Sequence, residues 1–167
     1  MENKIKILVT GANGYLGTGV VKQLCDDGNE VIAACHSTSN LVDCRATVKV
    51  GNIFSYDNPY EELGKPEVLL HMAWRNGFVH NDPSHIEDLP KHFEFIKKMA
   101  ESGVNQIAVI GSMHEVGFFE GSIKEDTPTH PESLYGISKD TLRNLTKLVC
   151  KNKNVVFQWL RGYYIVG

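Results

Sequence analysis

The chain has 167 residues, of which 42% are hydrophobic and 22% are charged, a balance typical of a globular domain with a substantial apolar core. The formal net charge is −3, and lysines and arginines are scattered singly, so the basic stripe that phosphate-backbone binding requires is absent and we expect no nucleic-acid partner. The apolar run near the N-terminus is too short for a membrane span, and Gly11 and Asn13 break it before a signal-peptide core could form. We therefore expect a cytoplasmic protein without membrane association.

Apolar runs of strand length alternate along the chain with segments whose apolar residues recur at helical spacing. We expect strands at residues 4–10, 30–36, 47–53, 68–74, 105–112 and 155–167, and helices at 15–28, 92–103 and 132–152. The remaining long segment, 75–91, is expected to be a surface loop that could contribute to ligand binding. Near-continuous hydrophobic strands separated by helices indicate an α/β fold, a doubly wound parallel sheet covering residues 1–167.

Four cysteines, at positions 25, 35, 44 and 150, show neither paired CxxC spacing nor the density of a secreted disulfide scaffold. We interpret them as buried small apolar side chains, and we expect no metal site.

Glycines recur at the junction of the first expected strand and the first expected helix, as Gly11, Gly14 and Gly17. A dinucleotide pyrophosphate needs a tight turn, close backbone approach and unpaired N–H groups at a helix N-terminus, and glycines permit all three. An ordinary tight turn between a strand and a helix is the alternative. The strand before the glycines and the helix after them favour dinucleotide binding.

A second motif, Tyr135-Gly136-Ile137-Ser138-Lys139, opens the longest expected helix. Residues four apart share a helix face, so Lys139 can lie near the Tyr135 phenol. A nearby cation favours phenolate, and we therefore expect Lys139 to lower the pKa of Tyr135 toward a range useful for general acid/base chemistry. A tyrosine and a lysine on a solvated helix face are the alternative.

The segments GANGYLG, HMAW, GSMHEVG, YGISK and LRGYYIVG together resemble the extended short-chain dehydrogenase/reductase family, and nucleotide-sugar epimerases and dehydratases are the relatives they resemble most. The resemblance implies a Rossmann fold, NAD or NADP as cofactor, a nucleotide-sugar substrate and hydride transfer at a sugar carbon. It also implies a homodimer formed through the helix that carries Tyr135.

The same resemblance implies roles for individual residues. Tyr135 would transfer the hydroxyl proton, and Lys139 would hold the nicotinamide ribose and tune the tyrosine. The cofactor would also be contacted by a set of residues near the carboxyl ends of the first four strands: Gly11, Asn13, Gly14, Tyr15, Leu16, Gly17, His36, Asn52, Ile53 and Ala73. His71 is expected to be a packed strand residue without a catalytic role.

Several positions depart from the family pattern. The second strand ends in Cys35-His36-Ser37, without the acidic residue that often reads the ribose of NAD, so His36 or the more distant Arg45 could favour the 2′-phosphate of NADP. Asn52 stands where the family commonly places an aspartate near adenine. Family members are also about twice as long, so the substrate-binding lobe is missing or truncated in this sequence. A catalytically incomplete NAD(P)-binding module or redox sensor is therefore the alternative to an enzyme.

The segment GSMHEVG raises a specific question about catalysis. Resembling enzymes carry a serine or threonine where this chain has Met113, and a thioether cannot donate a hydrogen bond to a sugar hydroxyl. Alignment with dehydratases makes Glu115 a candidate base and His114 a candidate acid; the alternative is that Met113 packs and both are loop residues. We expect Ser112 to lie within hydrogen-bonding reach of the Tyr135 hydroxyl or the nicotinamide, and Met113 to line the pocket beside it without polar contacts.

Overall fold

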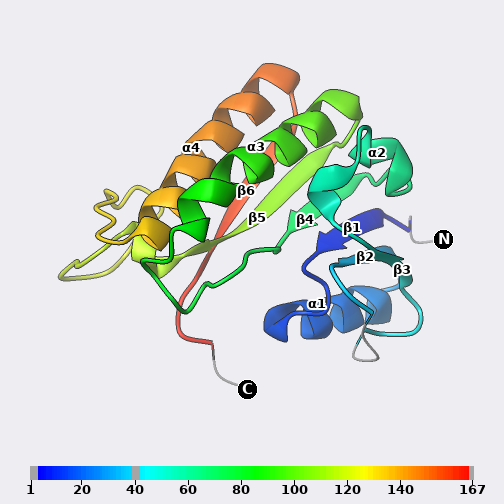
Figure 1. The fold of residues 1–167 in the computed structure, drawn as a ribbon, viewed down its shortest axis with the longest axis horizontal. Helices are drawn as coiled ribbons and strands as arrows, with labels where there is room; N and C mark the ends of the chain where they lie inside the picture. The colour runs from blue at the N-terminus through cyan, green and yellow to red at the C-terminus, as the bar shows by residue number, and fades with distance from the viewer. Residues whose placement is uncertain (1–3, 39–41, 166–167) are drawn as a thin grey trace.

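The computed structural model describes residues 4–38 and 42–165 and contains a six-stranded parallel β-sheet (Figure 1). The strands follow the spatial order β3-β2-β1-β4-β5-β6, and all neighbouring pairs are parallel. Their bounds are β1 Lys6–Thr10, β2 Glu30–Cys35, β3 Thr47–Val50, β4 Val68–His71, β5 Gln106–Ser112 and β6 Val156–Gly162. The doubly wound fold expected from the sequence is confirmed.

Helices cover both faces of the sheet (Figure 1). The α-helices are α1 Tyr15–Asp26, α2 Pro59–Glu62, α3 Ser84–Ser102 and α4 Leu134–Lys153, and the short 3₁₀ helices are η1 Ile53–Ser55 and η2 Met113–Glu115. The α3 and α4 helices pack side by side on one face, whereas α1 lies on the other.

The central strand β1 shows why this sheet is hydrophobic on both faces. Leu8 points into the core beneath α3 and α4, where it is packed with Ile96 and Leu142. Its neighbours Ile7 and Val9 alternate to the opposite core, beneath α1. Because both faces are buried, the strand is a continuous apolar run without a polar alternation.

Helix α3 begins at Ser84, eight residues before the expected start at residue 92. Residues 75–91 were expected to form a loop, but the early turns of this helix accommodate Pro90 even though proline is unfavourable inside helices. The helix nevertheless buries His85, Asp88 and His92, which recur at helical spacing on its inner face. This correction places two polar side chains of the expected loop, His85 and Asp88, inside the molecule beside His92.

Two strand ends also differ from expectation. β4 ends at His71, so the residues 72–74 leave the sheet at its carboxyl edge. β6 ends at Gly162, and residues 166–167 of the expected strand lie outside the described part of the chain. The cysteine interpretation holds for Cys35 and Cys150, whereas Cys44 is exposed and Cys25 is only half-buried.

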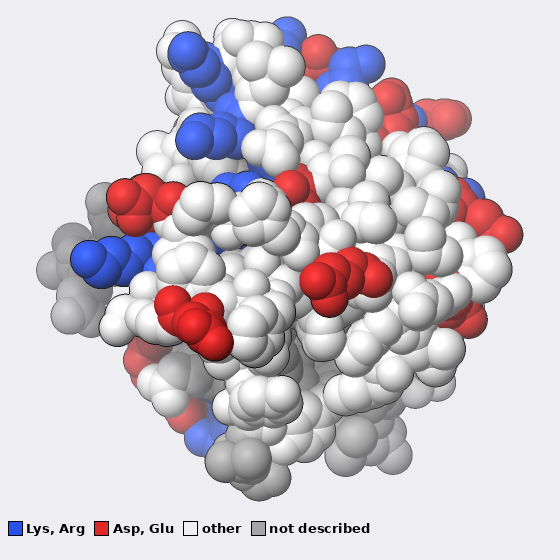
Figure 2. Space-filling model, turned by 90° about the vertical axis from the view of Figure 1, so that its left-hand side faces the viewer, with Lys and Arg blue, Asp and Glu red and all other residues white. Residues whose placement is uncertain are grey.

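The strand order places the topological switch point between β1 and β4, whose crossovers run to opposite sides. Figure 2 shows the face at the left of Figure 1, toward which the carboxyl ends of the strands point; it is mostly uncharged, with single acidic and basic side chains spread over it. Among the described residues, no helix is both long and apolar enough to cross a membrane. In open α/β sheets, ligands bind at the carboxyl edge beside the switch point.

Candidate active site

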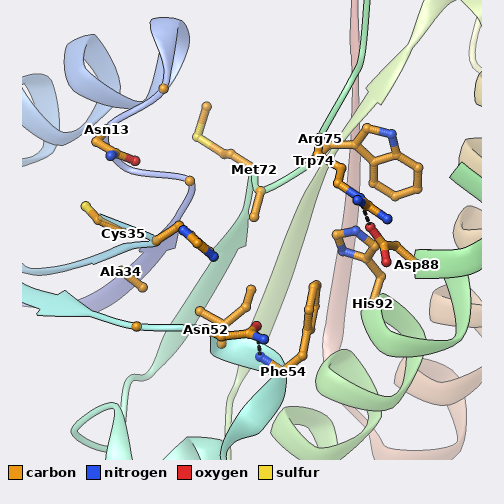
Figure 3. A pocket seen from close by; sticks show the side chains of 16 residues that line it. Asn13, Ala34, Cys35, Asn52, Phe54, Met72, Trp74, Arg75, Asp88 and His92 are labelled. Atoms are coloured by element: carbon orange, nitrogen blue, oxygen red, sulfur yellow. Dashed lines mark hydrogen bonds and ion pairs between the residues drawn. The ribbon is translucent and has the colours of Figure 1, made fainter. Parts of the chain in front are cut away.

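A pocket of about 350 Å³ opens at the carboxyl ends of β1 to β4 (Figure 3). Each strand end contributes part of its wall, and α3 closes one side. The lining residues are Gly11, Asn13, Gly14, Ala34, Cys35, His36, Gly51, Asn52, Ile53, Phe54, Met72, Ala73, Trp74, Arg75, Asp88 and His92. Seven of the residues predicted to bind a cofactor therefore share one cavity: Gly11, Asn13, Gly14, His36, Asn52, Ile53 and Ala73.

The glycine turn has the geometry that a pyrophosphate requires. Gly11 adopts φ +68°, and a side chain there would lie 2.9 Å from the backbone nitrogen of Ala73. A Cβ on Gly17 would overlap the Gly11 carbonyl oxygen, so Gly17 lets α1 pack against the turn. Gly14 is the N-cap of α1, and neither a capping side chain nor an acidic residue occupies this helix start. No carboxylate at this helix start would therefore repel an anion bound there.

Tyr15, Leu16 and Gly17 lie in the first turn of α1 and do not line the pocket. Their cofactor contacts stay a prediction.

The opposite end of the pocket is formed by residues after β2 and β3. The Asn52 side chain accepts a hydrogen bond from the Phe54 amide at 3.0 Å, which orders the turn into η1. His36 lies at the pocket edge, but Arg45 is held elsewhere, because its Nη2 atom pairs with Asp26 at 2.6 Å and with Asp43 at 2.7 Å. Of the two residues proposed to read a 2′-phosphate, His36 lines the pocket and Arg45 does not.

Trp74 connects this pocket to the Tyr135–Lys139 motif. Its ring lines the pocket and lies edge-on to the Tyr135 ring, with 6.1 Å between centroids. Lys139 is 3% exposed, donates to the Ile110 carbonyl at 2.8 Å, and holds its Nζ atom 4.1 Å from the Trp74 centroid. Burial lowers the pKa of Lys139 to about 7.

The pKa of Tyr135 differs in direction from the expectation. Burial raises the pKa of this phenol, and a hydrogen bond from Ser112 opposes that rise. Lys139 donates to Ile110, and its ammonium lies 5.9 Å from the centroid of the Tyr135 ring. Sequence spacing correctly put both residues on one face, but the predicted lowering of the Tyr135 pKa is wrong, because burial outweighs the neighbouring amine.

Ser112 and His114 lie beside Tyr135. The Ser112 side chain interacts with the phenol, as expected, and its hydroxyl also accepts from the His114 amide at 3.2 Å. The His114 ring centroid is 5.7 Å from that of Tyr135, and burial lowers the pKa of His114. Met113 begins η2, and its place beside the reacting hydroxyl stays a prediction.

Glu115 does not face the site as a free base. The carboxylate is fully buried and accepts hydrogen bonds from the Ser112 amide at 2.6 Å, the Trp159 indole at 2.8 Å and Arg161 Nε at 3.2 Å. These donors tie η2 to β6, so the geometry gives Glu115 a structural position.

Sequence reasoning missed nine lining residues: Ala34, Cys35, Gly51, Phe54, Met72, Trp74, Arg75, Asp88 and His92. Arg75 and Asp88 form an ion pair across the pocket wall (Figure 3). The spacing of His85, Asp88 and His92 was a usable signal, because polar residues at i, i+3 and i+7 share one helix face. The described residues contain no cluster of three or more histidines, cysteines or acidic residues suited to a metal ion.

Comparison with known proteins agrees with this geometry. Residues 7–167 match the NAD dependent epimerase/dehydratase family. The chain belongs to this family. It is 40% identical over 168 residues to a dTDP-6-deoxy-L-talose 4-dehydrogenase (NAD(+)) from Aggregatibacter actinomycetemcomitans, covering 98% of the chain and 62% of that relative.

Solved structures of family members share the fold at low sequence identity. A UDP-N-acetylglucosamine 4-epimerase from Methanobrevibacter ruminantium M1 superposes with a TM-score of 0.86 at 17% identity, over 99% of the chain and 56% of that protein. A UDP-glucuronic acid 4-epimerase from Bacillus cereus, solved with UDP-glucuronic acid and NAD, gives a TM-score of 0.79 at 20% identity, over 98% of the chain and 58% of that protein. The chain thus spans a little over half the length of these solved relatives and less than two thirds of the curated one.

Proposed function

We propose that this chain is the cofactor-binding portion of an NAD(P)-dependent oxidoreductase that oxidises or reduces a sugar carbon of a nucleotide sugar. The observation that carries the proposal is the position of Trp74, which joins the glycine-turn pocket to the Tyr135 hydroxyl region. A nicotinamide dinucleotide bound in the pocket would supply the hydride acceptor or donor, and the protein would position it. Tyr135, assisted by Ser112, would exchange the hydroxyl proton.

The residues present fit such a cofactor. Gly11 and Gly14 leave the backbone of the turn open, and the α1 N-terminus has no acidic residue to repel a pyrophosphate. Asn52 and Ile53 line the end of the same cavity away from the glycine turn, where the resemblance to the family implies adenosine.

Among the family's reactions, we favour simple oxidation or reduction over dehydration. Elimination of water needs a carboxylate base directed at the substrate, and Glu115, the candidate, is buried and bonded to Ser112, Trp159 and Arg161. The 40% identical relative is a dehydrogenase acting at carbon 4 of a dTDP-linked 6-deoxyhexose. We therefore propose a dTDP-linked deoxyhexose as the substrate class for the full-length form.

Titration with reduced nicotinamide dinucleotides, followed by cofactor fluorescence, tests the binding half of this proposal. The unmodified chain should change the emission, and Gly14→Val should abolish the change by placing a side chain against the pyrophosphate. Gly19→Ala is the matched control, because a Cβ on Gly19 meets nothing within 4 Å. Equal binding by the Gly14→Val and Gly19→Ala proteins would overturn the proposed location.

Turnover tests the catalytic half. The full-length form should interconvert a dTDP-4-keto-6-deoxyhexose and its 4-hydroxy product, with the matching change in nicotinamide absorbance. Binding without turnover in the full-length form would favour the alternative, a catalytically incomplete NAD(P)-binding module or redox sensor.

A further inference from the structure

His92 forms part of the pocket wall that faces the glycine turn. Its ring stacks on Trp74 with centroids 4.4 Å apart and meets Phe54 edge-on at 4.8 Å. In Figure 3 the imidazole lies beneath Trp74 and beside Asp88, across the pocket from Asn13 and Cys35. The residue is 3% exposed, so the small accessible part of this ring belongs to the pocket.

A line of buried hydrogen bonds reaches His92 from the end of β1. The Thr10 hydroxyl oxygen accepts from the Met72 amide at 3.1 Å and from the Ala73 amide at 3.2 Å. A hydroxyl has two lone pairs and one hydrogen, so these amides use its acceptor capacity. The hydroxyl hydrogen must therefore be donated to the remaining partner, His71 Nδ1, at 2.9 Å.

The hydrogen bond donated by Thr10 to His71 determines which ring nitrogen carries the proton in His71 and in His92. His71 Nδ1 is an acceptor, so the neutral ring carries its proton on Nε2 and donates it to His92 Nδ1 at 2.8 Å. His92 Nδ1 is then also an acceptor, and the neutral His92 ring carries its proton on Nε2. Within the described part of the chain, His92 Nε2 has no hydrogen-bond partner.

Both rings remain neutral over the ordinary pH range. Burial, followed by the charges of Lys139 and Lys91, lowers the pKa of His92 to about 3. Burial, His92 and Lys139 lower the pKa of His71 well below its usual value.

We propose that His92 is a ligand-binding residue, whose Nε2–H donates a hydrogen bond to an acceptor atom on the adenosine half of the dinucleotide. Thr10 sets the direction of this donor through His71. The inference rests on the proposed function. The adenosine half is favoured because Phe54, which contacts the His92 ring, directly follows Asn52 and Ile53 at the end of the pocket assigned to adenosine. The described residues offer Nε2 no alternative acceptor, so a bound ligand would satisfy it.

The tautomers can be observed directly and without turnover. Two-bond ¹H–¹⁵N correlation spectra of the ¹⁵N-histidine-labelled protein at neutral pH should show the Nε2–H pattern for both His71 and His92. Adding ADP-ribose should shift the His92 Nε2–H resonance, and adding nicotinamide mononucleotide should leave it in place. An Nδ1–H tautomer at His92, or no shift with bound ADP-ribose, would overturn the proposal.

Thr10 variants test the origin of the direction. Thr10→Ser keeps the hydroxyl and should keep the Nε2–H pattern at both rings. Thr10→Val removes the proton donor, so His71 and His92 should populate both tautomers. A pure Nε2–H pattern in Thr10→Val would show that Thr10 does not set it.

Affinity provides the complementary measurement. His92→Phe keeps the aromatic shape and removes the donor, and the ADP-ribose dissociation constant should rise about five- to tenfold, as for one neutral hydrogen bond. His92→Gln offers both an acceptor for His71 and a donor for the ligand, and should recover most of that loss. His130→Phe, at an exposed position outside the pocket, is the control.

The binding measurements distinguish a failure of the role proposed for His92 from a failure of the proposed function. Thermal melts identify any His92→Phe preparation that has unfolded, and the spectra of the unmodified protein stand without it. Unchanged ADP-ribose affinity in folded His92→Phe, while the unmodified protein still binds reduced dinucleotide, would remove the role of His92 and leave the proposed function standing. Absence of dinucleotide binding by the unmodified protein would remove both.

Discussion

The Nζ atom of Lys139 lies 4.1 Å from the centroid of the Trp74 ring, over its face. The ammonium is thereby held by an aromatic face and by the Ile110 carbonyl, and no carboxylate pairs with it in the described structure. This position puts a buried amine of lowered pKa between the cofactor pocket and Tyr135.

That burial predicts a specific dependence of stability on pH. The pKa of Lys139 falls from 10.5 to about 7 on folding, so between these values the unfolded chain binds more protons than the folded one. The free energy of unfolding should therefore rise with pH, by about 2 kcal/mol between pH 7 and 9 from this group. Lys139→Met should remove the rise, measured by urea unfolding at both pH values. Lys147→Met, at an exposed position of the same helix, should retain it.

Tyr135 and Lys139 should act as one catalytic unit in the full-length form. Tyr135→Phe removes the transferable proton, and Lys139→Met removes the neighbouring amine. The double variant should therefore lose little more kcat than either single variant. Steady-state kinetics of the three variants decide the point, and fully additive losses would indicate separate roles.

Substitution of Gly17 should mainly lower stability, whereas substitution of Gly14 should mainly weaken cofactor binding. A Cβ at Gly17 overlaps the Gly11 carbonyl and lies 2.9 Å from Ala12, so Gly17→Ala should lower the unfolding free energy by about 3 kcal/mol. Gly14→Ala meets only the Gly11 carbonyl oxygen, at 3.1 Å, and should cost stability less than Gly17→Ala while still weakening cofactor binding. Denaturant unfolding beside cofactor titration separates these effects. Gly19→Ala should stabilise α1 by about 1 kcal/mol.

Cofactor choice should respond to His36 and not to Arg45. NADP should bind at least as well as NAD, since no acidic residue stands at 35–37 to repel the 2′-phosphate. His36→Asp should weaken NADP relative to NAD by roughly tenfold through like-charge repulsion. Arg45→Met should leave the ratio unchanged, because Asp26 and Asp43 already hold that guanidinium. Titration of both cofactors against the three proteins tests this, and a strong NAD preference in the unmodified chain would contradict it.

Glu115 should contribute to stability through its buried contacts. Glu115→Gln leaves Arg161 without its carboxylate partner and should cost about 3 kcal/mol of unfolding free energy. Glu120→Gln, at an exposed position, should change it little. A Glu115→Gln protein as stable as the unmodified one would mean that the carboxylate is free to serve as a base.

The sequence predicted the fold and the glycine turn because both depend on local patterns. Strands buried on two faces read as continuous apolar runs, and Gly11, Gly14 and Gly17 lie within one turn of chain. The expected start of α3, at residue 92, was wrong. The helix begins at Ser84 and accommodates Pro90 within its early turns, although proline is unfavourable inside helices.

Tertiary structure alone decided where the polar groups point. Spacing placed Lys139 on the face of Tyr135, but only packing could put its amine over Trp74, which precedes it by 65 positions. The orientation of Glu115 likewise depends on Trp159 and Arg161 in another strand. The line from Thr10 through His71 to His92 joins the ends of two strands to a helix, and no local pattern encodes its proton positions. Periodicity reports which side of an element is buried, whereas hydrogen-bond direction depends on partners that only the folded chain brings together.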